Sequence, residues 1–489
     1  MANLWIKKSI SSLLKEADDK EKGLKPTLSA TALVMLGIGA IIGAGLFSIT
    51  GQVVAENTGP AVTYSFIIAG LGCAFAGLCY AEFASMIPVA GSAYTYSYTT
   101  FGEFIAWIIG WDLILEYSVA AAVVAISWTG YLNKMLAFYD IHLPVSLTTS
   151  VFDEAEGGII NLPAVLIVTM MSLLLMKGTK ESAWVNGIIV SLKVAVVLAF
   201  ILLGWGYINY DNYTPYLPEN TGVFGDFGWS GVMAGAAIVF FAYIGFDAVS
   251  TAAQEAKNPK RDMPIGILVS LAICTVLYIL FAHVMTGLAN YKEFGEGTDR
   301  LAPVATAISH TPYLWIQKAI ILAILAGYGS VILVSLMGQS RVFFSMSKDG
   351  LLPPVFSQLH PKFGTPAKSN LILLALVSLF AAFVPKDIVG EMASIGTLFA
   401  FVLVCIGVLI MRYGKKFKNH NTVDGVQTVT NGFKTPWVPV VPVLGIIFCL
   451  GMMVSLGWET WVRLFVWLGI GFIIYFFYGI KKSKLNNPK

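Results

Sequence analysis

Charged residues are scarce in this 489-residue sequence: Asp, Glu, Lys and Arg make up only 12% of it, whereas 57% of the residues are hydrophobic. Soluble globular domains are about 25% charged. The low charge content argues against a large soluble domain and indicates a polytopic membrane protein. The net charge of +3 adds little, because in such a protein the location of the positive charges decides more than their sum.

Cysteine and histidine are also scarce, with five residues of each. The cysteines lie in apolar segments and form no CxxC pair, so neither a disulfide framework nor a metal site is expected. The sequence contains no HExxH, GxSxG or Walker A motif. We therefore expect a protein that is not an enzyme and that has no cofactor, no metal and no nucleic-acid partner. Transport driven by ATP would require another subunit.

The N-terminal segment, residues 1–27, carries six lysines and lacks a long apolar core, so no cleavable signal peptide is expected. Hydrophobic residues such as Trp5, Ile6 and Ile10 are interspersed with its charged residues. Two interpretations are open. The segment is either a short amphipathic helix on the membrane surface or a disordered cytosolic tail.

Long apolar segments are abundant. A membrane-spanning helix needs about 20 mostly apolar residues. We predict twelve spans from the apolar segments of the chain, with residue ranges 30–54, 61–86, 104–137, 161–176, 183–206, 230–252, 265–289, 313–344, 369–384, 388–411, 437–457 and 460–480.

Lysine and arginine fix the predicted orientation, because they concentrate in cytoplasmic loops. With the N-terminus in the cytosol, 24 of the 31 fall on the cytosolic side and six on the outer side. One, Lys193, falls within a span. We therefore expect both termini in the cytosol, with the protein in the plasma membrane (the inner membrane of a Gram-negative host).

Glycine is frequent in the first span, where residues 37–47 read GIGAIIGAGLF. In the sixth span, residues 240–247 form a second glycine-bearing segment, FFAYIGFD. A helix rises about 1.5 Å per residue, which places Gly43 about 20 Å and Gly245 about 22 Å into their spans, near the membrane midplane. Spans 1 and 6 begin two sets of five, and the odd number requires the second set to be inverted. Paired broken helices at corresponding positions point to a transporter site.

A broken helix exposes backbone groups that, within hydrocarbon, must line a polar cavity or meet a ligand. N–H groups at a helix start suit a carboxylate, whereas freed carbonyls suit an ammonium, so one zwitterion would satisfy both. The alternative is close helix packing, because Gly39 and Gly43 form a GxxxG pair; the matched break in span 6 favours the ligand site. The predicted carboxylate-binding residues are Gly43, Ala44 and Gly45, and the predicted ammonium-binding residues are Ile41, Phe241, Ala242 and Ile244.

Ionisable residues within spans usually face a functional path. Lys193 lies about 15 Å into span 5, with no acid within ten residues. A lysine removed from water can release and take up a proton, so we favour a proton-coupling role. The alternative is a permanently charged lysine bound to carbonyls of a broken helix.

Four other polar residues have weaker signals. Glu116 lies about 18 Å into span 3 and would contact a cationic substrate group, remain a neutral hydrogen-bonded acid, or join a neighbouring helix; these alternatives stay open. Asp112 and Asp247 are predicted gating or structural groups, with Asp247 at a helix end that water or a basic side chain can reach. Tyr328, about 22 Å into span 8, would shape the pocket or simply pack in the bundle.

Five motifs in this order resemble the amino acid–polyamine–organocation superfamily, and particularly the bacterial relatives of the cationic amino acid transporters. Besides GIGAIIGAGLF and FFAYIGFD, they are GWDLILEY (110–117), KNPKRDMPIGI (257–267) and SKDGLLPPVF (347–356). The resemblance implies an all-α membrane protein that works by alternating access. Its twelve transmembrane helices would form a five-plus-five inverted repeat with discontinuous helices 1 and 6, plus two extra C-terminal helices. The first repeat would cover 28–206, the second 230–412, the extra helices 436–480 and the tail 481–489.

The resemblance also implies roles for individual residues. It assigns the carboxylate and ammonium contacts to the residues named above and puts Lys193 where sodium binds in sodium-coupled relatives. It turns Glu116 and Tyr328 toward the substrate side chain. Two features depart from the family pattern: Ala44 replaces a common serine or threonine, and Tyr328 would crowd a long side chain.

The expected function is proton-coupled symport of small neutral L-amino acids, with cationic ones left open. Besides the amino acid, the expected partners are protons, the lipid bilayer and, as an open question, a small accessory membrane subunit. The alternatives are an amino acid exchanger, and a non-transporting nutrient receptor or a channel with the same fold.

Overall fold

The structure is a computed structural model. It describes residues 3–10, 12–13, 28–89, 91–153, 157–177, 180–295, 302–361, 363–414, 422–423, 426–427 and 432–487, and for 180–186, 314–316, 387, 422–423 and 426–427 it describes the backbone alone. The remaining part of the predicted N-terminal segment lies outside these residues.

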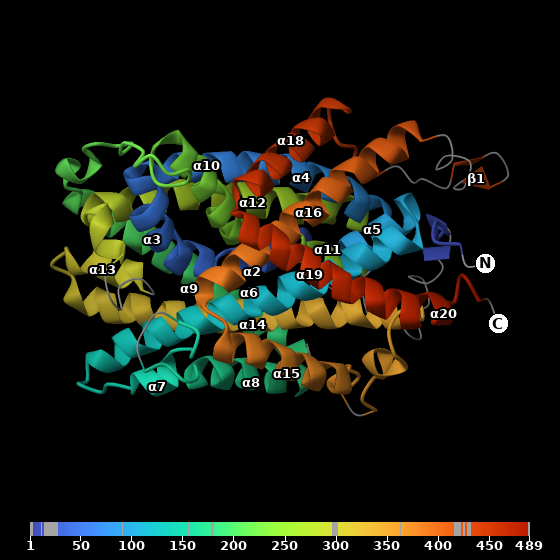
Figure 1. The fold of residues 1–489 in the computed structure, drawn as a ribbon, viewed down its shortest axis with the longest axis horizontal. Helices are drawn as coiled ribbons and strands as arrows, with labels where there is room; N and C mark the ends of the chain where they lie inside the picture. The colour runs from blue at the N-terminus through green and yellow to red at the C-terminus, as the bar shows by residue number, and fades with distance from the viewer. Residues whose placement is uncertain are drawn as a thin grey trace.

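The described chain is almost entirely helical. Its strands are β1 (Thr422–Val423) and β2 (Val426–Gln427), which pair antiparallel. Figure 1 shows the long helices running roughly along the longest axis of the molecule. The two ends of the chain lie at the same end of the molecule, where the backbone N–H of Asn3 donates to the side-chain oxygen of Asn486 at 2.7 Å.

The helical elements of the first half follow one another with short connections. In chain order they are α2 (Ala30–Ile41), η1 (Gly45–Ile49), α3 (Thr50–Val53), η2 (Val54–Thr58), η3 (Gly59–Ala61), α4 (Val62–Met86), α5 (Ser92–Thr100), α6 (Glu103–Ala137), α7 (Val145–Thr148), α8 (Leu162–Lys177), α9 (Lys180–Gly204), η4 (Trp205–Tyr207) and η5 (Tyr210–Tyr213).

The second half begins with a similarly fragmented span. Its elements are α10 (Gly228–Val239), η6 (Phe240–Tyr243), α11 (Ala248–Thr251), η7 (Ala253–Glu255), α12 (Pro259–Leu288), η8 (Tyr291–Gly295), α13 (Pro303–Ser309), α14 (Leu314–Lys348), η10 (Pro354–Ser357), α15 (Ala367–Phe383), α16 (Lys386–Tyr413), α18 (Val440–Ser455), α19 (Trp458–Ile474), η11 (Tyr475–Gly479) and α20 (Ile480–Lys482).

All twelve predicted ranges fall on helical segments. Within the described residues, eight helical stretches are long and apolar enough to cross a membrane, and three shorter apolar helices accompany them. One of the eight, Ala30–Met86, includes both the first and the second predicted span. The structure therefore supports a membrane protein built from many apolar helices, while the number of bilayer crossings and the inverted repeat remain predictions.

Two long helices form the centre of the fold. α6 and α14 have 35 residues each and pack along each other. α12 packs against α2 and α4, and α16 packs against α6 and α18. On the peripheral helices large apolar side chains are exposed, for example Leu202 at 73% and Phe477 at 74%. We expect these side chains to face lipid, because water would oppose so much exposed apolar surface.

The described N-terminal residues are packed on the protein. Ile10 and Leu13 are buried. The Lys8 ammonium lies 2.5 Å from the Asp349 carboxylate at the end of α14, and Trp5 packs edge-on against Phe104. This part of the segment is therefore held by specific contacts, which neither interpretation of residues 1–27 anticipated.

Candidate functional site

The first predicted span is interrupted within GIGAIIGAGLF. α2 ends at Ile41, and Ile42 is extended, with φ −72° and ψ 104°. Gly43 is also outside the helix, and the chain then continues through Ala44 into the π-helical turn η1. Like every helix start, this one has N–H groups without an acceptor inside the helix.

The sixth predicted span is interrupted at the corresponding place. α10 leads into the 3-10 turn η6, after which Ile244 is extended with ψ 132° and Gly245 has φ +121°. The helix resumes as α11. Residues with a Cβ rarely adopt such a φ, so glycine at 245 makes this turn possible.

The two interruptions touch each other. A Cβ built on Gly45 would lie 2.2 Å from the Cα of Ala242, and a Cβ built on Gly245 would lie 2.9 Å from the carbonyl carbon of Ala40. Neither distance leaves room for a side chain. Glycine at 45 and 245 therefore allows the two broken segments to meet backbone to backbone, far from each other in sequence.

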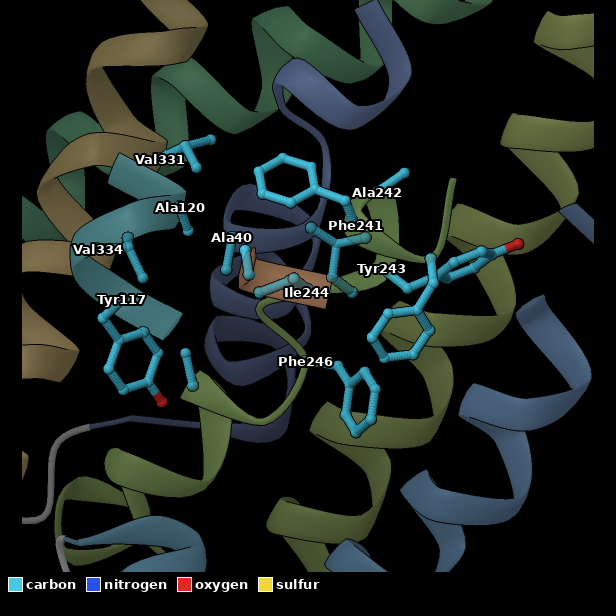
Figure 2. Packing of buried hydrophobic residues seen from close by; sticks show 14 of the residues in the cluster. Ala40, Tyr117, Ala120, Phe241, Ala242, Tyr243, Ile244, Phe246, Val331 and Val334 are labelled. Carbon is cyan, nitrogen blue, oxygen red and sulfur yellow. The ribbon is translucent and has the colours of Figure 1, made fainter. Parts of the chain in front are cut away.

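A cavity of about 20 Å³ lies beside this contact. Residues between 40 and 45, residues between 241 and 248, and one face each of α6 and α14 form its wall. Figure 2 shows Tyr117 and Val334 on one side, the 241–246 segment on the other, and Ala40 between them. The volume accommodates about one water molecule. A larger guest would therefore require these walls to separate.

The predicted substrate residues divide into two groups around this cavity. Three of the nine do not line it: Ala242, Glu116 and Tyr328. The six that line the cavity are Ile41, Gly43, Ala44, Gly45, Phe241 and Ile244.

Each of the three lies behind the wall or on another helix face. Ala242 packs against Gly45. Tyr328 lies one turn beyond Val331 on α14, with its ring 6.3 Å from that of Phe47. Glu116 has Thr397 of α16 as a neighbour. A direct contact of these side chains with a guest in the cavity would need a different conformation.

Tyr278 of α12 connects the two broken segments, and sequence reasoning did not identify it. Its hydroxyl lies 2.8 Å from the carbonyl oxygen of Ile41 and 2.9 Å from that of Ala242, and it donates to both in turn. These are two of the carbonyls predicted to hold an ammonium. The two carbonyls thus share one hydroxyl proton. Of the four predicted ammonium-binding residues, Ile41, Phe241 and Ile244 line the cavity, and Ile41 is the one of these three that Tyr278 contacts.

Lys193 of α9 caps the C-terminal end of α2. Its ammonium donates to the carbonyl oxygens of Gly39 at 2.8 Å and Ile42 at 3.0 Å, and the side chain is 1% exposed. Its Cε packs on Gly327 of α14, where a Cβ would come within 2.9 Å. A cation at a helix C-terminus is favourable because the unpaired carbonyls carry partial negative charge. This geometry corresponds to the cation of a broken helix that the sequence left as the alternative; the proton-coupling role remains a prediction.

Tyr117, which lines the cavity, is held by Asp247. The Tyr117 hydroxyl donates to Asp247 Oδ2 at 2.8 Å, and the N–H of Gly245 donates to Oδ1 at 3.2 Å. Asp247 is fully buried, so the prediction that water or a basic side chain reaches it is wrong for this structure. Tyr117 directly follows Glu116, and its position on the other face of α6 was missed.

The cavity wall is mostly apolar. Besides backbone, it presents Ala120, Val124, Val331 and Val334, and its polar side chains are those of Tyr117 and Ser335. The residues of α6 recur at intervals of three and four, as do those of α14, so each helix contributes one face. This arrangement suits a guest with a polar end at the backbone breaks and an aliphatic end toward α6 and α14.

A larger cavity of about 240 Å³ lies toward the end of the molecule that holds the chain termini. Arg341, Lys348 and Asp349 of the α14 end line it, together with Tyr94 and Tyr98 of α5. Tyr117 lines the small cavity, and its ring packs on Gly338 of α14, where a Cβ would lie 3.3 Å from it. Gly338 follows Met337, which lines the larger cavity, so the Tyr117 ring lies near both cavities.

Comparison with known families identifies the fold and its general activity. A family model described as amino acid permease matches residues 27–479. The chain belongs to the amino acid permease family. The match of this family model to the permease confirms the resemblance drawn from the five motifs.

Two relatives from Bacillus subtilis (strain 168) match nearly the whole chain. The branched-chain amino acid permease BcaP is 45% identical, covering 99% of this chain and 99% of the relative. The methylthioribose transporter is 41% identical, covering 99% of this chain and 100% of the relative. The vacuolar cationic amino acid transporter 4 of Arabidopsis thaliana is 32% identical over 100% of this chain and 97% of the relative. These relatives are permeases and transporters, so the permease is a transporter and not an enzyme.

Proposed function

We propose that the permease is a secondary active transporter that carries small neutral amino acids with aliphatic side chains, together with protons, by alternating access. The observation that carries the proposal is the cavity beside the contact of two broken helices. Such a site offers N–H groups at a helix start and free carbonyls within one short distance, which is the complement of a zwitterion.

The side-chain end of the cavity supports an aliphatic substrate. Val124, Val331 and Val334 supply apolar surface, and no acidic side chain lines the cavity. A cationic side chain would therefore lose its water without gaining a carboxylate, which is costly. Relatives with 45% and 32% identity are named branched-chain amino acid permeases. Both arguments favour leucine, isoleucine, valine and smaller neutral residues over arginine or lysine.

Proton coupling through Lys193 remains part of the proposal. The lysine holds the carbonyls that end α2, so loss of its proton would weaken the hold on the broken segment and bias it between outward and inward states. We also propose that the termini lie in the cytosol, as the lysine and arginine distribution predicts, and that the larger cavity is the cytosolic mouth of the pathway.

Binding is the first test of the substrate class. The purified permease is heated with each of the twenty amino acids and with methylthioribose. An amino acid at about 100 times its Kd should stabilise the protein by about 2.7 kcal/mol. We expect leucine, isoleucine or valine to raise the melting temperature and arginine to leave it unchanged. Stabilisation by methylthioribose alone would contradict the amino acid assignment.

Uptake into proteoliposomes tests the mode of transport. We expect labelled branched-chain amino acid to accumulate when the outside is acidic and to equilibrate without accumulation when no gradient is present. Counterflow without gradient-driven accumulation would identify an exchanger instead. Binding without any turnover would identify a receptor, and ohmic current would identify a channel.

A further inference from the structure

Two acids on α6 are buried without partners. Asp112 and Glu116 stand four positions apart, so their side chains leave the same face of the helix. Both are 0% exposed. None of their four carboxyl oxygens has a hydrogen-bond partner within the described chain. Buried polar side chains nearly always have one, and each exception requires an explanation.

The surroundings of the pair leave room for carboxyl groups but do not neutralise them. Asp112 points at α16, where a Cβ on Gly396 would come within 2.8 Å of its Oδ1. The neighbour of Glu116 on α16 is Thr397, whose single hydroxyl proton is donated to the Ala393 carbonyl at 2.9 Å. These two neighbours on α16 therefore supply neither a positive charge nor a free hydroxyl proton.

The ionisable groups in electrostatic range of the pair are all acids or phenols. They are Asp247 in the span 6 break, Tyr117 on α6 and Tyr80 on α4, whose own buried hydroxyl also has no partner. From α14, Gln339 donates to the Ser118 hydroxyl rather than to either acid. Lys193 is engaged at the end of α2, and the ionisable side chain near it is the buried thiol of Cys274. In the described part of the chain, no Lys, Arg or His faces the pair.

Two ionised carboxylates in this position would be prohibitively unstable. Burying a single unpaired charge costs several kcal/mol, and two like charges one helical turn apart oppose each other further. A bound metal ion would compensate, but the described residues contain no group of three or more His, Cys, Asp or Glu side chains that could hold one. The remaining ligand that neutralises a carboxylate is a proton.

We propose that Asp112 and Glu116 form a proton-binding site, separate from Lys193, that holds protons on their carboxyl oxygens in this conformation and exchanges them with water during transport. The exchange part rests on the proposed proton-coupled function. The binding part depends only on the pair and its surroundings.

The pair is linked to the small cavity through one residue. Tyr117 follows Glu116 in the chain, lines the cavity and donates to Asp247. When Glu116 loses its proton, its negative charge acts on Asp247, and the hydrogen bond that holds Tyr117 at the cavity wall becomes less stable. Proton release is thereby coupled to the part of the cavity wall that Tyr117 forms.

Infrared spectroscopy of the purified permease tests proton binding directly. A protonated carboxylic acid has a carbonyl stretching band that is distinct from that of a carboxylate and shifts in heavy water. We expect such a band near neutral pH, and we expect it to diminish in Asp112→Asn, in Glu116→Gln and most in the double variant. The matched control is Glu391→Gln on α16, because Arg463 already holds that acid at 3.1 Å; its band region should not change. An unchanged band in the double variant overturns the proposal.

Transport by the same variants tests proton exchange. Amino acid counterflow checks that each variant folds correctly. Each single variant keeps one carboxyl group of the pair, so at least one of them is expected to fold. One coupled proton allows about a tenfold accumulation of substrate for each pH unit of gradient. We expect the double variant to retain counterflow but to lose this gradient-driven accumulation. Gradient-driven accumulation that persists in the double variant overturns the exchange part. If the unaltered permease itself ignores the gradient, the proposed coupling fails, and the infrared band still decides whether the pair binds protons.

Discussion

Two sets of buried ionisable side chains, Lys193 and the Asp112–Glu116 pair, have opposite surroundings. Lys193 has two carbonyl acceptors at 2.8 and 3.0 Å at the end of α2. Asp112 and Glu116, on the α6 face toward α16, have no hydrogen-bond donor among the residues that the structure describes. Burial alone therefore does not define the role of an ionisable residue. The backbone carbonyls of a broken helix stabilise the charge of a lysine, whereas the two acids each need a bound proton to be neutral.

The largest effect that this comparison predicts concerns the lysine. Lys193→Met keeps the length of the side chain but leaves the carbonyls of Gly39 and Ile42 unpaired. We expect a loss of at least about 2 kcal/mol of stability, because each buried acceptor without a partner costs about 1–3 kcal/mol. Thermal unfolding of the purified variant measures it.

A matched control for the lysine is available on the same helix. Leu192 is 43% exposed on the outer face of α9, so Leu192→Met should change the melting temperature little. An equal effect of both substitutions would show that the two carbonyl contacts of Lys193 do not support the end of α2.

The next effect concerns the space around Asp112. Gly396→Ala places a methyl group 2.8 Å from Oδ1 of Asp112. We expect about 1–3 kcal/mol of destabilisation from overpacking. Asp112→Ala in the same chain should remove the clash and recover most of the loss, whereas Asp112→Asn, with the same shape, should not. A double-mutant cycle with no interaction energy between the two sites would contradict the placement of this carboxyl.

The smallest effect is predicted for neutral replacement of the acids. If the pair is already protonated, Asp112→Asn combined with Glu116→Gln exchanges one neutral group for another, and stability should change by less than about 1 kcal/mol. Glu103→Gln on the same helix provides the contrast. Its carboxylate accepts from Tyr98 at 2.7 Å and from Tyr475 at 3.1 Å, so it should lose more. The reverse order in urea or thermal unfolding would mean that the pair is ionised.

The sequence predicted the features that depend on local patterns, namely the positions of the helices and of their interruptions. Apolar length placed all twelve predicted ranges on helices, and glycine within GIGAIIGAGLF and FFAYIGFD located both interruptions. A cluster of glycine in an apolar run has few explanations, because each one weakens a helix. Close packing and a position at the cavity are compatible at one residue, since Gly45 packs on Ala242 and also lines the cavity.

The sequence did not predict which helix faces meet. α6 is apolar around most of its circumference, so no polar stripe reveals that Tyr117 rather than Glu116 lines the cavity. Tyr278 could not be recognised either, because its two partners, Ile41 and Ala242, lie 237 and 36 residues away in the chain. Tyr328 lies about one turn from Val331, the nearest α14 residue in the cavity wall, and does not line the cavity. Such errors arise because tertiary packing, not local pattern, decides the rotation of a buried helix.

Binding of leucine to a variant that fills the cavity tests the central claim most directly. Val331 lines the cavity beside Gly43, whose Cβ would lie 3.1 Å from it. Val276 is 57% exposed on the outer face of α12 and serves as the control. We predict that Val331→Trp abolishes the leucine-induced rise in melting temperature, while Val276→Trp leaves it intact. Leucine binding that survives unchanged in Val331→Trp would place the amino acid site somewhere else.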